Sequence, residues 1–284
     1  MRWDYGKVYQ YIRKSKGLTQ EEVCQDVFAR STLARIESGK VIPQFDTMMF
    51  LLRQIDMGLD EFEYICNYYQ PNQRQTIINQ LSNLSGISLT SDLEKLVSLC
   101  DEYLQKEHDT PIERIYKILK VNLLLGKSQD FFTNPQLNQI TQDIWNEIEK
   151  QDVWYFNDLK LLSTILYHFS FENIEINTQK ILENLKKYSD YRETNYYQFS
   201  ILMNLSTIYL RNYRIKEAKA IALWALEIAQ KLKRFDCLGF AQVRLGICQK
   251  DEEMIKKGVA LLKLTEENHL VASLENEIEQ YYQP

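Results

Sequence analysis

Apolar residues recur at helical spacing along most of the chain. Val8 and Ile12 stand four positions apart, and Leu33 and Ile36 stand three apart, so each pair falls on one face of a helix. Amphipathic stretches of the same kind continue from about residue 76 to the end. Glycine and proline, which interrupt helices, number only 9 and 5 in 284 residues. The pattern predicts an all-α protein.

Capping signals divide the first 66 residues into about five short helices. Thr19 and Glu22 have the spacing of a capping box, so a helix is predicted to start at Thr19 and to bury Val23 and Val27. The stretch FARSTLARIESGK, residues 28–40, is predicted to form the next helix.

The end of that helix and the last helix of the head are also marked. Gly39 is expected to end the helix, and Pro43 to prevent an immediate restart. A second capping box, Asp60 with Glu63, predicts that a final helix begins at Asp60.

The outer face of the 28–40 helix is polar and basic. If Leu33 and Ile36 face inward, the outward residues are Arg30, Ser31, Thr32, Ala34 and Arg35. Residues 1–40 hold 8 Lys/Arg and 5 Asp/Glu, although the whole chain carries a net charge of −5. A basic head on an acidic body suits a module that approaches an anion, and ordinary charge scatter is the alternative explanation.

Three segments of the head resemble the helix-turn-helix domain of the phage-repressor class: LTQEEV, RSTLARIESGK and GLDEF. The turn VFARS is shorter than in the general class and lacks its glycine. Together with Gly6–Lys7 and Arg13–Lys14, this turn is similar to that of the Rgg/MutR family of transcriptional regulators. Ala29 departs from that family, which tends to have a serine N-cap at this position.

The resemblance implies DNA-contacting roles, because the second helix of such a motif enters the major groove. Arg30, Ser31 and Thr32 are expected to face the groove, and Gln20 to touch phosphate. Three further cations are expected to grip the DNA backbone: Arg35, Lys40 and Arg13. Glu37 matches a position that more often pairs with a neighbouring cation. Solvated surface charges are the alternative for each arginine.

A polar segment, residues 68–75 (YYQPNQRQ), is the expected boundary between two domains. The predicted division is a helix-turn-helix domain at 1–66, a linker at 67–75 and a helical-repeat domain at 76–284. Within the last, residues 201–230 match helices A and B of a tetratricopeptide repeat. The matching positions are Leu205, Ser206, Tyr209, Ala218, Ala222 and Ala225.

Weaker copies of the repeat lie 40 residues away on either side. Leu245, Gly246 and Gly258 fit the template after it, and Ile165, Phe169 and Leu185 fit it more loosely before it. Leu125–Gly126 offers a still weaker fourth copy. Stacked helix pairs of this kind curve into a solenoid with a concave surface suited to an extended peptide.

Residues near positions 6, 9 and 13 of helix A should line that concave surface. In the repeats these are Thr164, Tyr167, Asn204, Thr207, Arg211 and Arg244. An asparagine amide can donate to a peptide carbonyl and accept from an N–H at once. The segments 154–169 and 203–210 also resemble Rgg segments, except that Thr164 stands where the family often has asparagine. Members of the family bind short imported pheromone peptides in the solenoid and act as homodimers, which implies the same partners here.

Other chemistry is not indicated. No zinc, P-loop or dinucleotide-binding motif occurs, so no enzyme activity, metal or cofactor is expected. The five cysteines form no C-x-x-C pair, and no signal peptide or run of 18 apolar residues occurs. The sequence therefore predicts a cytoplasmic protein with buried, reduced thiols, with a regulatory disulfide as the alternative.

Taken together, these features predict a cytoplasmic, peptide-responsive transcriptional regulator that binds operator DNA as a homodimer and has no membrane partner. Two alternatives stay open. The repeats could form a scaffold that docks a protein, or the chain could regulate transcription without sensing a peptide.

Overall fold

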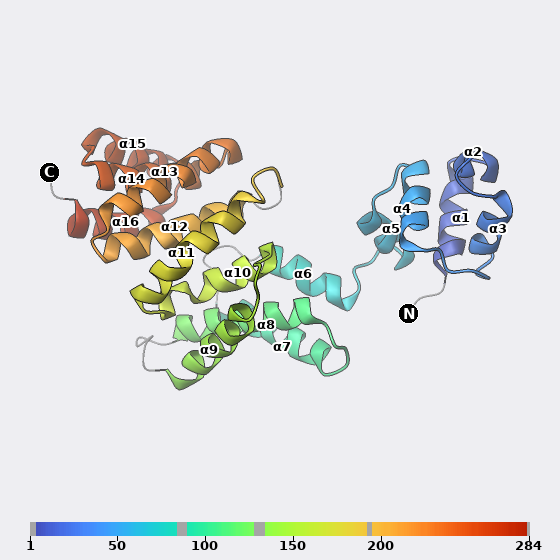
Figure 1. The fold of residues 1–284 in the computed structure, drawn as a ribbon, viewed down its shortest axis with the longest axis horizontal. Coiled ribbons are helices and arrows are strands. Elements are labelled where there is room, and N and C mark those ends of the chain that lie inside the picture. The colour runs from blue at the N-terminus through green and yellow to red at the C-terminus, as the bar shows by residue number, and fades with distance from the viewer. Residues whose placement is uncertain (1–3, 84–89, 128–133, 192–194, 283–284) are drawn as a thin grey trace. The chain divides into compact units, whose positions relative to one another are not determined.

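All regular structure in the described part of the chain is helical, as the sequence predicts. The computed structural model describes residues 4–83, 90–127, 134–191 and 195–282. The chain divides into two compact units, which Figure 1 shows in ribbon form. Unit 1 comprises Met1–Ser88 and Leu99–His108, and unit 2 comprises Leu89–Ser98 and Asp109–Pro284.

Unit 1 contains the five short helices predicted for the head. They are α1 (Tyr5–Ser15), α2 (Gln20–Cys24), α3 (Arg30–Glu37), α4 (Phe45–Gln54) and α5 (Leu59–Cys66). Their inward faces form one hydrophobic core, to which Ile12, Leu33 and Ile36 contribute, as their spacing predicts. The next helix, α6, spans Gln73–Asn83.

The predicted capping box at the start of α2 is present. The Glu22 N–H donates to Thr19 Oγ1 (3.2 Å), and the Thr19 N–H donates to Glu22 Oε2 (2.7 Å). The prediction that Val27 is buried is wrong: its side chain is 62% exposed. Because α2 ends at Cys24, before Gln25 with its φ of 46°, Val27 no longer shares a helical face with the buried Val23.

The second predicted box is also wrong, because α5 begins one residue early. Its N-cap is Gly58, and no side chain caps it. The stop after α3 is confirmed. Gly39 has a φ of 74°, its N–H donates to Ile36 O (2.9 Å), and the Lys40 N–H donates to Arg35 O (2.9 Å). This pair of bonds is a Schellman motif, which glycine favours because it lacks a Cβ.

Unit 2 is built from longer helices. They are α7 (Thr90–Leu104, shared with unit 1), α8 (Thr110–Lys127), α9 (Pro135–Glu149), α10 (Phe156–Ile165), α11 (Phe171–Lys186), α12 (Asn195–Arg211), α13 (Ile215–Leu232), α14 (Phe235–Gln249), α15 (Glu252–Leu264) and α16 (Asn268–Tyr281). A 3₁₀ turn, Leu166–His168, follows α10. The hydrophobic core of the unit extends from α8 to α16.

The pair α12–α13 packs as the repeat template predicts. Ser206, Ala218, Ala222 and Ala225 are each fully buried, with 0% exposure. The Ser206 hydroxyl donates across the pair to Ala218 O (3.1 Å). Small side chains at these positions let the two helix backbones approach closely.

Glycines perform the same function in the pair α14–α15. A Cβ added at Gly258 would lie 2.7 Å from Gly239 O, and one at Gly246 would lie 2.7 Å from a side-chain carbon of Ile255. The earlier copy is shorter than the template, because α10 ends at Ile165 and Tyr167 lies in the 3₁₀ turn.

All five cysteines are buried thiols. Burial raises the pKa of Cys100 and Cys248 to about 11, and that of Cys237 to about 12. These three thiols are therefore protonated at neutral pH and react slowly with oxidants. Among the described helices, none has the length and apolar content needed to cross a membrane.

Helices α1 and α3 approach closely at Gly6. A Cβ at Gly6 would lie 1.9 Å from Ile36 O, a backbone atom that cannot move without shifting α3. We expect Gly6→Ala to lower the free energy of unfolding of unit 1 by about 1–3 kcal/mol, the typical cost of overpacking. Amide hydrogen exchange in α1 and α3 would measure this loss. Gly58→Ala is the control, since a Cβ there meets nothing within 4 Å. Equal protection in the two variants would contradict the close approach.

Candidate functional sites

The exposed face of α3 carries the residues expected to contact DNA. Arg30, Ser31, Thr32 and Arg35 are exposed, while Leu33 and Ile36 are buried beneath them. Lys40 is exposed in the turn that follows the helix. The structure therefore places these five predicted residues on α3 and the turn that follows it, and the inward side chains of this helix pack in the core of unit 1.

The helix start is as weak as the sequence indicates. Its N-cap, Ala29, makes no side-chain hydrogen bond to the first turn. Losing such a cap costs on the order of 1 kcal/mol. The position of α3 must therefore come from contacts made by its buried side.

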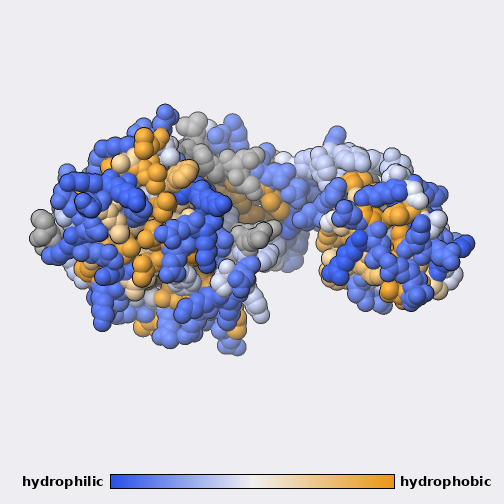
Figure 2. Space-filling view, turned by 90° about the horizontal axis from the view of Figure 1, so that it is seen from above, coloured by the Kyte–Doolittle hydropathy of each residue, from blue (hydrophilic) through white to orange (hydrophobic). Residues whose placement is uncertain are grey.

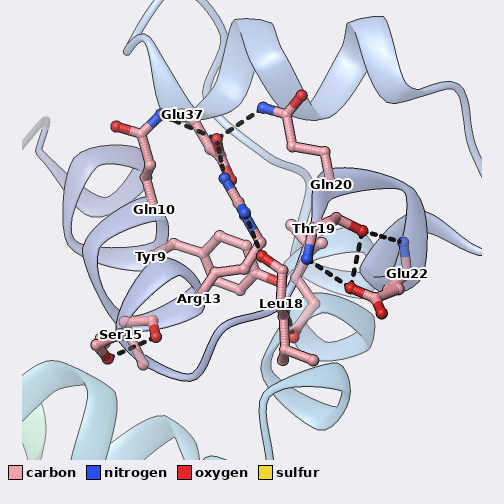
Figure 3. Close-up of polar contacts among 11 residues, drawn as sticks. Tyr9, Gln10, Arg13, Ser15, Leu18, Thr19, Gln20, Glu22 and Glu37 are labelled. Atoms are coloured by element: carbon pink, nitrogen blue, oxygen red, sulfur yellow. Dashed lines mark hydrogen bonds and ion pairs between the residues drawn. The ribbon is translucent and has the colours of Figure 1, made fainter.

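A buried polar network supplies those contacts (Figure 3). Arg13 Nε lies 2.6 Å from Glu37 Oε1, and Arg13 Nη2 lies 3.0 Å from Glu37 Oε2. The side-chain amides of Gln10 and Gln20 also donate to Glu37 Oε2, at 3.0 and 2.8 Å. The carboxylate at the end of α3 thus connects it to both α1 and α2.

Arg13 corrects one expectation. Its residue exposure is 5%, and its third nitrogen, Nη1, donates to the backbone carbonyl of Leu18. All three guanidinium nitrogens are therefore engaged inside the unit, so Arg13 is not placed to grip a DNA backbone. The expectation that Glu37 pairs with a cation is confirmed, and that cation is Arg13.

Gln20 is only partly exposed, and its side chain already makes a hydrogen bond within unit 1. It is the first residue of α2 and is half-buried, and its amide nitrogen is directed to Glu37. Its expected phosphate contact stays a prediction. No sequence pattern pointed to the support that Gln20 and Gln10 give to Glu37.

Hydrogen bonding keeps the buried carboxylate ionised. Burial by itself would raise the pKa of Glu37, but the hydrogen bonds from Arg13, Gln20 and Gln10 and the charge of Arg13 lower it below its usual value. The hydrogen bond to Glu37 in turn raises the pKa of Arg13. The pair is charged throughout the neutral range.

In unit 2, five of the six residues expected to contact a peptide form one polar cluster. The Tyr167 hydroxyl donates to Asn204 Oδ1 (3.2 Å), and the Arg211 guanidinium lies 5.6 Å from the centre of the Tyr167 ring. Arg244 Nη1 donates to Thr207 Oγ1 (2.7 Å). We call these five residues and Glu277, described next, the Arg244 cluster.

Glu277, on α16, is a member that the sequence reasoning missed. Its Oε1 lies 2.7 Å from Arg244 Nη2. The contact joins residues 33 positions apart, and nothing in the local sequence around Glu277 distinguishes it from an exposed acidic residue. Arg244 is consequently fully buried, with 0% exposure, rather than lining an open surface as expected.

The tyrosine connects the two halves of the cluster. Burial raises the pKa of Tyr167, while a hydrogen bond with Thr207 and the charges of Arg211 and Arg244 act in the opposite direction. The phenol therefore stays protonated at neutral pH and remains able to donate to Asn204.

Thr164 is not joined to the cluster by a hydrogen bond in the described structure. Its hydroxyl donates back to Lys160 O (3.2 Å) within α10, a common arrangement for threonine in a helix. Thr207 also bonds back, to Met203 O (2.8 Å), but it accepts from Arg244 as well.

The described residues contain no group of three or more His, Cys, Asp or Glu side chains arranged to hold a metal ion. Some charged groups elsewhere join neighbouring helices. Arg114, for example, pairs with Glu147 and Asp158 at 2.8 Å each, between helices α8, α9 and α10.

Comparison with known proteins identifies the fold of both units. Residues 10–62 match the helix-turn-helix family HTH_3. The whole chain is similar to a structure from Listeria monocytogenes EGD-e, described as a candidate transcriptional regulator, with 19% identity, a TM-score of 0.72, and coverage of 98% of this chain and 97% of that one.

Two further solved structures have the same fold. One is Bacillus thuringiensis PlcR in complex with the peptide PapR7 and DNA, with 15% identity, a TM-score of 0.68, and 96% and 99% of the two chains covered. The other is the Streptococcus dysgalactiae SHP pheromone receptor Rgg2, with 12% identity, a TM-score of 0.66, and 97% and 99% covered. At these identities the likeness shows the fold.

The comparisons confirm the predicted fold class: a helix-turn-helix domain followed by helical repeats, in the arrangement found in Rgg and PlcR structures. The family match is to a helix-turn-helix, and the three structures are described as a regulator, a DNA- and peptide-bound protein and a receptor. The expectation that the chain is not an enzyme stays a prediction.

The buried pair Arg13–Glu37 gives a stability test. Arg13→Met should leave the Glu37 carboxylate without its cation, which typically costs about 3–5 kcal/mol. Because the folded pKa of Glu37 is depressed, this contribution is complete above the unfolded value of about 4.3 and is lost as the pH falls through the folded pKa.

Stability of unit 1 in wild type and Arg13→Met should therefore differ most near pH 7 and converge toward pH 3. Urea unfolding of the full chain, monitored by hydrogen exchange in α1 and α3, would measure the difference. A difference that is the same at both pH values would show that the charge pair does not support α3.

Proposed function

We propose that this chain is a sequence-specific DNA-binding transcriptional regulator whose unit 2 binds a short peptide. The observation that supports the DNA half most strongly is the exposed face of α3. Cations and hydroxyls stand there on a helix whose opposite side is fixed in the core. Among the solved structures of the same fold, PlcR is in complex with DNA and a peptide.

On this proposal, α3 is the helix that enters the major groove. Arg30 can form a bidentate hydrogen bond to a guanine edge, while the Ser31 and Thr32 hydroxyls can donate to or accept from a base edge. Arg35 and Lys40, at the other end of the helix, contact phosphates and fix the register. Gln20 contacts phosphate from the start of α2.

The Arg244 cluster is the proposed peptide site. Asn204 is half-buried, and its amide N–H group donates to no residue in the described structure, while its oxygen accepts from Tyr167. It can therefore donate to a peptide carbonyl. Figure 2 shows an apolar patch on the displayed face of unit 2, which suits a hydrophobic peptide.

The proposed assembly is a cytoplasmic homodimer. Two heads related by a two-fold axis would read half-sites about one helical turn apart. A peptide that binds one arrangement of the chain better than another would shift the equilibrium between them, and DNA binding would change with it.

The DNA contacts can be tested with two single substitutions. Arg30→Ala and Arg35→Ala should each weaken binding to DNA from upstream of the protein's own gene, without changing thermal unfolding, because both side chains are exposed. Arg35→Ala should also make the negative slope of log K against log salt less steep by about 0.9, the value for one phosphate contact. Lys256→Ala, which removes the same charge from an exposed position on α15, is the matched control. Wild-type affinity in both arginine variants would refute the assignment.

The peptide contact can be tested at Asn204. Synthetic hydrophobic peptides encoded by short reading frames beside the gene would be titrated by calorimetry. Asn204→Ala should leave peptide groups unpaired and weaken binding by about 1–3 kcal/mol, or 5- to 150-fold. Asn177→Ala is the matched control, since in the described part of the chain that amide donates back to Asn173 O in its own helix.

Ser206→Leu provides the structural control for the same experiment. It places a large side chain where exposure is 0% and should lower the melting temperature, which Asn204→Ala should not. If Asn204→Ala binds every peptide as wild type does, the residue is not part of the site.

A further inference from the structure

We propose that Arg244 is a receptor for a carboxylate group and that Glu277 is its internal occupant, which an acidic group of the bound peptide replaces. This inference rests on the proposed function and specifies the chemistry of the same site. The carboxylate could be the peptide's C-terminus or an Asp or Glu side chain, since the two have the same chemistry.

The guanidinium of Arg244 is buried but incompletely satisfied. Nη1 donates to Thr207 and Nη2 donates to Glu277, while Nε has no hydrogen-bond partner among the residues that the structure describes. An arginine presents five N–H donors in a fork that fits a carboxylate with two parallel bonds. A buried donor without a partner is costly, and a carboxylate that also reached Nε would satisfy it.

The contrast with Arg13 shows that this is not a general feature of buried arginines in the chain. Arg13 engages all three of its nitrogens, and its acid partner is 1% exposed at the side chain. The side chain of Glu277 is 14% exposed, so the carboxylate side of Arg244 is the side open to solvent.

The helix that carries Glu277 buries fewer residues than its neighbours. Val271 and Leu274 are the fully buried residues of α16, and Leu270, Ile278 and Tyr281 pack against the core only partly buried, whereas α13 fully buries six. Its aromatic end meets the α12–α13 pair through Tyr281 and the exposed Tyr213, whose rings lie 6.1 Å apart. Elements held by few apolar contacts open at low free energy.

Charge favours replacement by another anion. Arg211 and Arg244 both belong to the cluster, and Glu277 is the carboxylate that the described structure pairs with Arg244. Exchange of one carboxylate for another keeps the buried guanidinium neutralised, whereas a neutral group would leave a buried charge unpaired. The site thus selects an acid, and its binding would release α16 from Arg244.

Chemical rescue tests the receptor without knowledge of the peptide. Glu277→Ala should remove the internal carboxylate and lower the melting temperature of unit 2. Sodium acetate at millimolar concentration should then restore several degrees, while acetamide or equimolar sodium chloride should not. Wild type should not respond to acetate. Glu217→Ala is the matched control, because its partner Arg214 is 43% exposed at the side chain and keeps a second carboxylate partner, Glu175, so acetate should not stabilise that variant. Absence of acetate rescue in folded Glu277→Ala would overturn the proposal.

A second variant covers the case in which Glu277→Ala does not fold. Glu277→Gln keeps the shape of the side chain and a carbonyl acceptor but removes the competing charge. The hydrophobic peptides described above, with a free C-terminal carboxylate, should bind Glu277→Gln several-fold more tightly than they bind wild type. If the terminal carboxylate is the ligand, amidation of the C-terminus should abolish this increase in affinity. If the increase in affinity persists on amidation and disappears when Asp and Glu of the peptide are replaced, an acidic side chain of the peptide is the ligand.

Equal affinity of acids and neutral analogues for Glu277→Gln would contradict the inference while leaving peptide binding intact. If instead no peptide binds wild type or variant, the proposed peptide function fails, and the acetate experiment still decides whether Arg244 is a carboxylate receptor.

Discussion

The bond between Arg13 and Glu37 is the constraint on which the proposed DNA-binding surface depends. Helix α3 has eight residues and no side-chain cap, and an isolated helix of that length is unstable in water. Two apolar residues and one carboxylate hold it to the rest of unit 1. Through Glu37 the end of α3 is bonded to α1 and α2, and Gly6 allows the α1 backbone to approach at that point. The exposed cations of α3 keep a constant orientation because the buried side of the helix is bonded to α1 and α2 and packed in the core.

Unit 2 contains a second buried arginine with a different consequence. Arg13 is enclosed by partners from adjoining helices of a small core, so its pair with Glu37 is structural. Among the described residues Arg244 has an unpartnered nitrogen, and its acid partner belongs to a helix with two fully buried residues. On the proposals above, the same chemical pair supports a fixed surface in one unit and an exchangeable contact in the other. What differs is how completely the guanidinium is satisfied and how firmly its partner is held.

The sequence predicts features that depend on neighbours along the helix. Leu33 and Ile36 lie inside, and Thr19 and Glu22 cap α2, because a spacing of three or four residues fixes a shared face. The prediction for Val27 is wrong because α2 ends sooner than its apolar pattern suggests.

The two buried arginines could not be placed from sequence. Burial of a cation depends on its partners, and those of Arg13 and Arg244 stand 24 and 33 positions away. Recognition of the repeat did place Tyr167, Asn204 and Thr207 near Arg244, because helix register repeats along a solenoid. Glu277 lies outside that register.

Hydrogen exchange on the full chain, with and without duplex DNA from upstream of its own gene, would show whether α3 is the DNA-contacting helix. We expect DNA to slow exchange at amides of residues 30–40 and at the start of α2. These are the segments whose outer surfaces would meet the duplex. Exchange in α12 and α14 should change less than in that surface. Unchanged exchange across residues 30–40 while DNA is bound would show that the chain contacts DNA elsewhere, and α3 would not be the helix that enters the groove.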